Sequence, residues 1–257
     1  MIKKLASTKK SVAARLAAFA GLTALLLITA CSLMRSNIPT KQYYIITYTP
    51  KMNKPPESLR PYPFSLQVGR FEVQRIFNRQ NIIYRFSPHR IQYYETERWA
   101  VRPDEMIQDM VFKHIDASHI ANRVGLNFLD TRPDYRIDGT VDALEKYDAG
   151  DLFFAHLAMT FRLLRISDGE QVWNYSFDKR RQIYSKEMVH TVMGLSSILQ
   201  TEMNYVVDRL DSLFYGYRTG SKLNLAGTQE TPAAKAPKDS TGAQIDESGF
   251  EIIPEKK

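Results

Sequence analysis

Hydrophobic and polar residues alternate along much of the chain. This alternation predicts β-strands, because successive side chains of a strand point to opposite faces. The clearest case is residues 134–146, where Tyr135, Ile137 and Val141 alternate with polar and charged residues. Two further alternating runs flank the Asp-Gly pair at residues 168–169, which is typical of a hairpin. We predict strands at residues 43–48, 64–73, 82–86, 90–95, 134–146, 152–166 and 171–185.

Two longer segments carry apolar residues at helical spacing instead. Pro103 opens the first, two carboxylates follow where the helix dipole favours them, and we expect this helix to continue to Gly125. The second helix is expected over residues 187–215, with an apolar stripe along one side. This order of elements predicts a single α+β domain over residues 43–215, with a mostly antiparallel sheet and two amphipathic helices on one face.

The N-terminal residues have the pattern of a bacterial lipoprotein signal. Five basic residues precede an apolar run over residues 16–30, which is short for a membrane span. The run ends in Ile28-Thr29-Ala30-Cys31, a lipobox, and this cysteine is the chain's only one. We predict a signal peptide over residues 1–30, cleavage between Ala30 and Cys31, and a diacylglycerol and an N-acyl lipid such as palmitate on Cys31. The alternative is an ordinary buried cysteine at the end of an uncleaved anchor helix.

The charge of the chain resides largely in this N-terminal segment. Without residues 1–30 the formal charge falls from +7 to about +2, because five basic and no acidic residues are removed. A nucleic-acid partner is therefore not expected. Residues 31–42 read as a polar lipidated tether, and residues 216–257 as a disordered tail that is too poor in apolar residues to fold.

No group of residues in the sequence assembles a convincing active site. The histidines do not form a metal motif, and Cys31 is consumed by the predicted acylation. The carboxylate pairs Asp138 with Asp142 and Glu145 with Asp148 are expected to be solvated, the first pair on the exposed face of a strand. We therefore expect a protein that is not an enzyme, with no catalytic residue, no metal and no cofactor beyond the lipid on Cys31.

Several short stretches together resemble a known family. They are Tyr43-Tyr44-Ile45 shortly after the cysteine, the segment from Asn78-Arg79-Gln80 to Arg85, and Arg98-Trp99-Ala100 before the first helix. With them, the chain resembles the ABC-type transport auxiliary lipoproteins, the PqiC-like group that accompanies MCE-domain lipid transport systems. The resemblance covers residues 43–214. The chain departs from the family pattern in lacking a proline after Arg79 and in reading Val101-Arg102-Pro103 where the family has Glu-Pro-Leu.

The resemblance implies a non-catalytic lipoprotein of the cell envelope. Such a protein would bind an MCE-domain protein with its ABC permease and ATPase, support lipid transport between membranes and envelope integrity, and possess a lipid anchor. Ser32 after the cysteine favours the outer membrane, facing the periplasm. A homo-oligomer is compatible with this role. The motif positions, with either a structural or a docking role, are Tyr43, Tyr44, Arg79, Gln80, Arg98 and Trp99.

Three other functions compete with this one. A lipoprotein that helps to assemble a secretion or cell-wall machine would have a similar small α+β domain. An envelope hydrolase requires an activated nucleophile beside a base, and the sequence supplies none. Lipid binding inside the domain requires a cavity between sheet and helices, and periodicity does not distinguish a cavity from a filled core.

Overall fold

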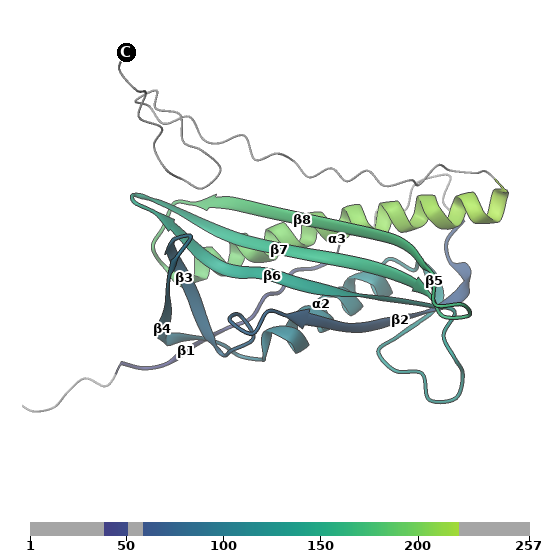
Figure 1. The fold of residues 1–257 in the computed structure, drawn as a ribbon, viewed down its shortest axis with the longest axis horizontal. Coiled ribbons are helices and arrows are strands. Elements are labelled where there is room, and N and C mark those ends of the chain that lie inside the picture. Colours follow the sequence, from purple (N-terminus) through teal and green to yellow (C-terminus); the bar gives the residue numbers. More distant parts are fainter. Residues whose placement is uncertain (1–38, 51–58, 221–257) are drawn as a thin grey trace, which may run out of the picture. The chain divides into compact units, whose positions relative to one another are not determined.

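The computed structural model describes residues 39–50 and 59–220. The chain divides into two units, Met1–Thr40 and Lys41–Lys257, and the description concerns the second (Figure 1). Ala30, Cys31, the signal peptide and the residues after 220 lie outside the described residues, so the expectations for them remain predictions.

Most of the expected elements are present, with shifted ends. The strands are β1 (Gln42–Tyr44), β2 (Tyr62–Val73), β3 (Asn81–Ser87), β4 (Arg90–Trp99), β5 (Ala121–Gly125), β6 (Tyr135–Ala149), β7 (Leu152–Arg165) and β8 (Gln171–Ile183). The helices are α2 (Pro103–Ala117) and α3 (Met188–Thr219). The α+β class is thus confirmed for the described residues, and α3 continues four residues beyond the expected boundary at 215.

The first helix is shorter than predicted. It ends at Ala117, and His119 then takes a positive φ of 51°, which a continuing helix does not allow. Residues 121–125 form the strand β5, which the sequence analysis missed, and β5 pairs in parallel with β2. A run of five residues has too few apolar positions to distinguish the two periodicities, and its pairing with β2 decides the outcome.

The sheet is mixed, so the expectation of a mostly antiparallel sheet holds only in part. The strands β6, β7 and β8 form a long antiparallel meander. On its other edge β6 pairs in parallel with β2 over its first half and with β3 near its end. With β1·β4 and β2·β5, four of the seven pairings among the described strands are parallel.

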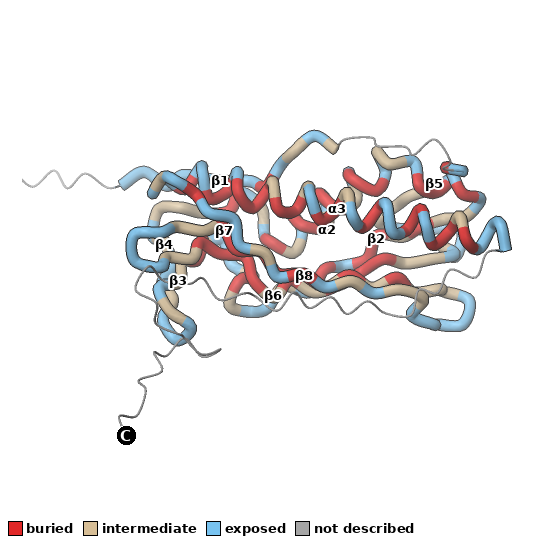
Figure 2. The backbone as a smooth tube through the Cα atoms, turned by 90° about the horizontal axis from the view of Figure 1, so that it is seen from above, coloured by how far each residue is buried: buried red, intermediate tan, exposed pale blue. Residues whose placement is uncertain are grey.

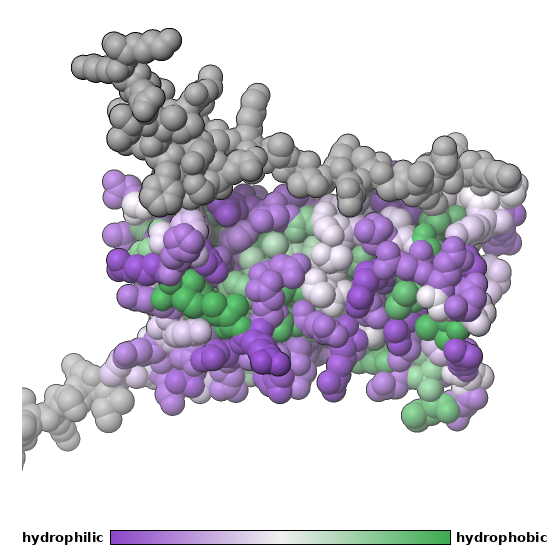
Figure 3. Space-filling view, in the orientation of Figure 1, coloured by the Kyte–Doolittle hydropathy of each residue, from purple (hydrophilic) through white to green (hydrophobic). Residues whose placement is uncertain are grey.

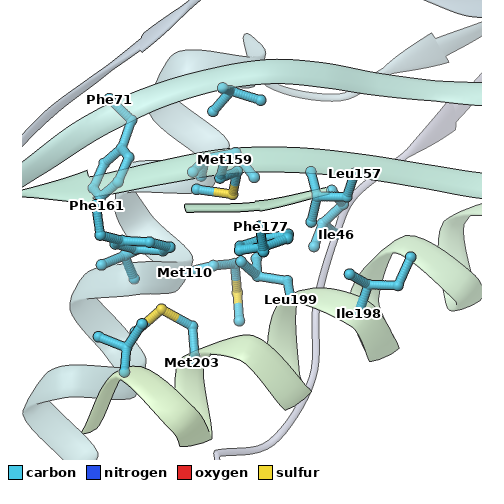
Figure 4. Close-up of a cluster of buried hydrophobic side chains, with 14 of the residues drawn as sticks. Ile46, Phe71, Met110, Leu157, Met159, Phe161, Phe177, Ile198, Leu199 and Met203 are labelled. Carbon is cyan, nitrogen blue, oxygen red and sulfur yellow. The ribbon is translucent and has the colours of Figure 1, made fainter. Parts of the chain in front are cut away.

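Both helices cover the same face of this sheet (Figures 1 and 2), as predicted. Buried residues concentrate where the helices face the strands, and Figure 4 shows the side chains that meet there. Phe161 and Met159 of β7 and Phe177 of β8 pack against Leu199 and Met203 of α3 in this layer. The core therefore holds α3 against β7 and β8. This packing also sets the position of the start of α3 relative to the sheet.

Candidate functional site

The motif residues of the sequence converge at one end of the sheet. β1 lies in parallel beside the end of β4, where Tyr43 is paired with Arg98 and Tyr44 with Trp99. The backbone N–H of Trp99 donates to the carbonyl of Gln80 over 2.6 Å, which brings in the segment before β3. We call this the motif corner, made of Tyr43, Tyr44, Arg79, Gln80, Arg98 and Trp99.

Trp99 is the buried part of the motif corner. It ends β4, only 1% of its surface is exposed, and it is among the largest fully buried side chains of the described residues. The next residue, Ala100, donates its N–H to the carbonyl of Tyr44 over 2.8 Å, so β1 is fastened beside the tryptophan. The position of Trp99 therefore supports a structural role.

Arg79 and Gln80 are exposed. The Arg79 guanidinium lies over the ring of Tyr93, 5.1 Å from its centroid, and this arrangement favours a cation–π contact. Tyr93 also borders a shallow hollow of about 630 Å³, which is lined by residues of the paired strands β3 and β4. We call this region the β3–β4 surface; besides Arg79, its residues are Asn81, Tyr84, Ile91, Gln92, Tyr93, Tyr94 and Glu95.

Partly buried polar side chains lie at and beside the motif corner. Burial, followed by the nearby Asp148, Tyr84 and Glu97, raises the pKa of Tyr94 to about 12. One buried side-chain atom in each of Glu97, Arg98 and Asp148 has no hydrogen-bond partner among the described residues. Unpaired buried polar atoms are costly, so this end of the domain differs from the apolar core under β7 and β8.

A second cluster of charges lies on the sheet and links the four strands β3, β6, β7 and β8. Arg85 Nε donates to Glu145 over 2.7 Å, and the two ring nitrogens of His156 contact Glu145 at 3.0 Å and Asp178 at 2.8 Å. Burial alone would raise the pKa of Glu145, but hydrogen bonds from His156 and Arg85 outweigh it and hold the pKa below its usual value. Burial would likewise lower the pKa of His156, whereas hydrogen bonds to Asp178 and Glu145 raise it.

This cluster corrects the expectation of solvated carboxylates. Glu145 is fully buried, and Asp138 is only 8% exposed because Arg136 and Arg162 flank it and donate to it. Neighbouring strands supply the partners: His156 is paired with Glu145, and Arg162 with Asp138, in the register of β6 and β7. The face of the sheet shown in Figure 3 is nevertheless largely hydrophilic, with apolar residues between the polar ones.

The chemistry available to this cluster is binding and stabilisation. Both ring nitrogens of His156 face carboxylates, which leaves no nitrogen of this ring to accept a proton from a nucleophile. No three His, Cys, Asp or Glu side chains among residues 39–50 and 59–220 are arranged to hold a metal ion. The expectation that the chain is not an enzyme remains a prediction.

Sequence reasoning had identified the motif corner but missed Tyr93 as the partner of Arg79 and missed the cluster around Glu145. A signal was present in the sequence. Acidic residues of β6 stand opposite a histidine and an arginine of β7, as Glu145 does opposite His156 and Asp138 opposite Arg162. This signal can be interpreted only when the register of β6, β7 and β8 is known.

Neither described helix is long and apolar enough to cross a membrane.

Comparison with known protein families identifies the family of this chain. The model of the family described as "ABC-type transport auxiliary lipoprotein component" matches residues 44–206. The chain belongs to this family. The match begins at Tyr44 and therefore includes most of the motif corner and the β3–β4 surface. No curated protein matches the chain.

Solved structures share the fold of this auxiliary lipoprotein. A Xanthomonas campestris protein of the family DUF330 is 21% identical, covers 71% of this chain and 100% of its own, and superposes with a TM-score of 0.58. A second, uncharacterised protein is 14% identical and covers 67% of this chain and 99% of its own, with a TM-score of 0.53. At these identities, the likeness concerns the fold alone.

Proposed function

We propose that this auxiliary lipoprotein is a non-catalytic adaptor that binds the MCE-domain protein of an ABC-type system and supports lipid transport between membranes. A lipid on Cys31 would hold it in the outer membrane, facing the periplasm. The observation that carries the proposal is the family match over residues 44–206, with the motif positions gathered at one end of the sheet.

The β3–β4 surface is the part of this region suited to docking. Arginine and tyrosine are enriched at the energetically important positions of protein interfaces. Arg79 and Tyr93 lie together there at the surface, beside a hollow lined by further tyrosines. Trp99 is the buried member of the motif corner and supports it from within the fold. An adaptor needs such a rigid surface and no reacting group, which agrees with the paired ring nitrogens of His156.

Co-purification after brief crosslinking in cells tests the proposal. The wild-type lipoprotein is expected to recover an MCE-domain protein, or its permease and ATPase, and the variant Cys31→Ala to recover much less. Exchanging Arg79 and Tyr93 for alanine is expected to reduce recovery several-fold while the lipid anchor remains. Arg132→Ala is the matched control, since Arg132 is an exposed arginine in the connection between β5 and β6.

Two results would count against the proposal. Recovery of secretion or cell-wall assembly proteins alone would replace the transport role with an assembly role. Equal recovery by the wild type and by the Arg79 and Tyr93 double variant would remove the β3–β4 surface as the docking site.

A further inference from the structure

The segment that follows β1 runs alongside the first half of α3. The N–H of Thr47 donates to Ser196 Oγ over 3.3 Å, and Gln200 Nε2 donates to the carbonyl of Thr49 over 3.0 Å. Two residues of extended chain and four residues of helix both advance about 6 Å, so the segment and the helix run in the same direction. Following both backwards places Ile45 beside the second turn of α3.

Exposed apolar side chains line both sides of this contact. Tyr43 and Ile45 are two residues apart on the extended segment, and Val189 and Met193 are four apart on the helix, so each pair shares a side. All four are between 44% and 62% exposed. Tyr184, just before α3, is 90% exposed. We call these five residues the β1–α3 patch.

The patch lies on the outward side of well-packed elements. Ile46 and Val192, the neighbours of Ile45 and Met193 in sequence, are buried in the core. The patch therefore has a fixed backbone beneath it, and its exposure does not result from loose packing. Figures 1 and 2 show β1 and the start of α3 at the same end of the unit, the end at which the described chain begins.

The position of the predicted lipid anchor indicates what covers the patch. Cys31 lies twelve residues before Tyr43, and a chain of that length spans at most roughly 40 Å. The anchor thus keeps this end of the unit near the bilayer. Tyrosines mixed with aliphatic side chains suit the boundary between headgroups and acyl chains. Lys41 and Lys186 border the patch, but Glu187 offsets part of their charge, so apolar contact is the main attraction.

We propose that the β1–α3 patch rests in the surface of the membrane that holds the lipid anchor, so that the domain lies against the bilayer at this end. This inference rests on the lipidation of Cys31 in the proposed function. It leaves the β3–β4 surface available to a protein partner, and it gives the domain a defined orientation on the membrane.

Depth-dependent fluorescence quenching tests the inference. The full-length lipidated protein, selected by mass for the lipid on Cys31, receives one new cysteine for an environment-sensitive fluorophore. The positions are Met193→Cys in the patch and Tyr217→Cys as the matched control, which is 54% exposed on the same helix. Twenty-four residues of helix separate them by about 36 Å. Vesicles of phosphatidylethanolamine and phosphatidylglycerol carry brominated acyl chains as the quencher.

The label at residue 193 is expected to be quenched several-fold more strongly than the label at 217. Exchanging Ile45 and Val189 for aspartate is expected to abolish that difference while the protein stays anchored and folded. Equal quenching at both positions of the wild-type protein overturns the inference. So does a label at 193 that is shielded from water but not quenched by lipid, because a second copy of the chain would then cover the patch. Either failure with Cys31 lipidated leaves the adaptor proposal standing, whereas absence of the lipid overturns the inference and the membrane-anchored form of the proposed function.

Discussion

Replacement of Trp99 by alanine separates a structural role of the motif corner from a docking role. The side chain is 1% exposed at the end of β4, beside β1 and the segment before β3. Its removal would leave a cavity bounded by backbone that the pairing of β1 with β4 holds in place. Core substitutions of this kind destabilise proteins by about 3–5 kcal/mol.

A loss of this size is readily measured by thermal unfolding. For a domain of this length each kcal/mol shifts the Tm by about 2–4 °C, so Trp99→Ala is expected to lower the Tm by roughly 6–20 °C. Arg79→Ala is the matched comparison from the same corner. Because Arg79 is exposed, its replacement is expected to change stability by no more than about 0.5 kcal/mol.

The two variants are also expected to differ in partner recovery. Arg79→Ala weakens recovery of the transport partner without unfolding the protein. Trp99→Ala weakens recovery only in proportion to the protein that remains folded. A Trp99→Ala protein with wild-type stability and no partner binding would refute this reasoning, since it would make Trp99 a docking residue.

Two further predictions concern stability, one from a close contact at Gly139 and one from the burial of His114. A Cβ added at Gly139 would lie 1.8 Å from the carbonyl oxygen of Thr160, so Gly139→Ala is expected to cost about 3 kcal/mol in chemical unfolding. Gly69→Ala, whose Cβ would meet side chains at 3.1 Å or more, is the milder control, and equal losses would contradict the packing argument. Burial lowers the pKa of His114 to about 4, so the folded protein binds fewer protons than the unfolded chain between this value and the usual 6.5. The contribution of His114 to stability is therefore complete above about pH 6.5 and is lost as the pH falls toward 4, by up to roughly 1.4 kcal/mol per pH unit. The variant His114→Gln is expected to weaken this pH dependence. Chemical unfolding measured across the same pH range tests it. An unchanged pH dependence would remove His114 as its source.

The elements that the sequence predicts best are those whose periodicity is long and uninterrupted. The strand containing Tyr135, Ile137 and Val141 and the long helix α3 are present where alternation and helical spacing placed them. The end of α2 was wrong because Ala121 fits a helical stripe as well as a strand, and only pairing with Tyr62 of β2 distinguishes the two.

The parallel strand pairings could not be predicted from local sequence patterns. β2 and β6 are paired from Leu66 and Tyr135 onward, about seventy residues apart, and no sequence period reports on such a contact. The burial of Glu145 was missed for a related reason. Its partners Arg85 and His156 belong to other strands, so their contact depends on register and not on the spacing within one strand.

The motif corner was predictable as a set of residues but not as a geometry. Tyr43, Arg79 and Trp99 lie far apart in the sequence, and the resemblance alone grouped them. The structure divides them into a buried tryptophan and exposed residues on two neighbouring surfaces. Exposure, which the sequence did not indicate, is what makes Arg79 the candidate for the proposed docking and favours a structural role for Trp99.

Site-specific photo-crosslinking in cells tests the adaptor role most directly. A photoreactive amino acid in place of Tyr93 on the β3–β4 surface is compared with one in place of Leu129, which is 92% exposed in the connection after β5. The account predicts a crosslink from position 93 to an MCE-domain protein or its permease, and none from position 129. Crosslinks from position 93 only to secretion or cell-wall assembly proteins, or the same products from both positions, would contradict it.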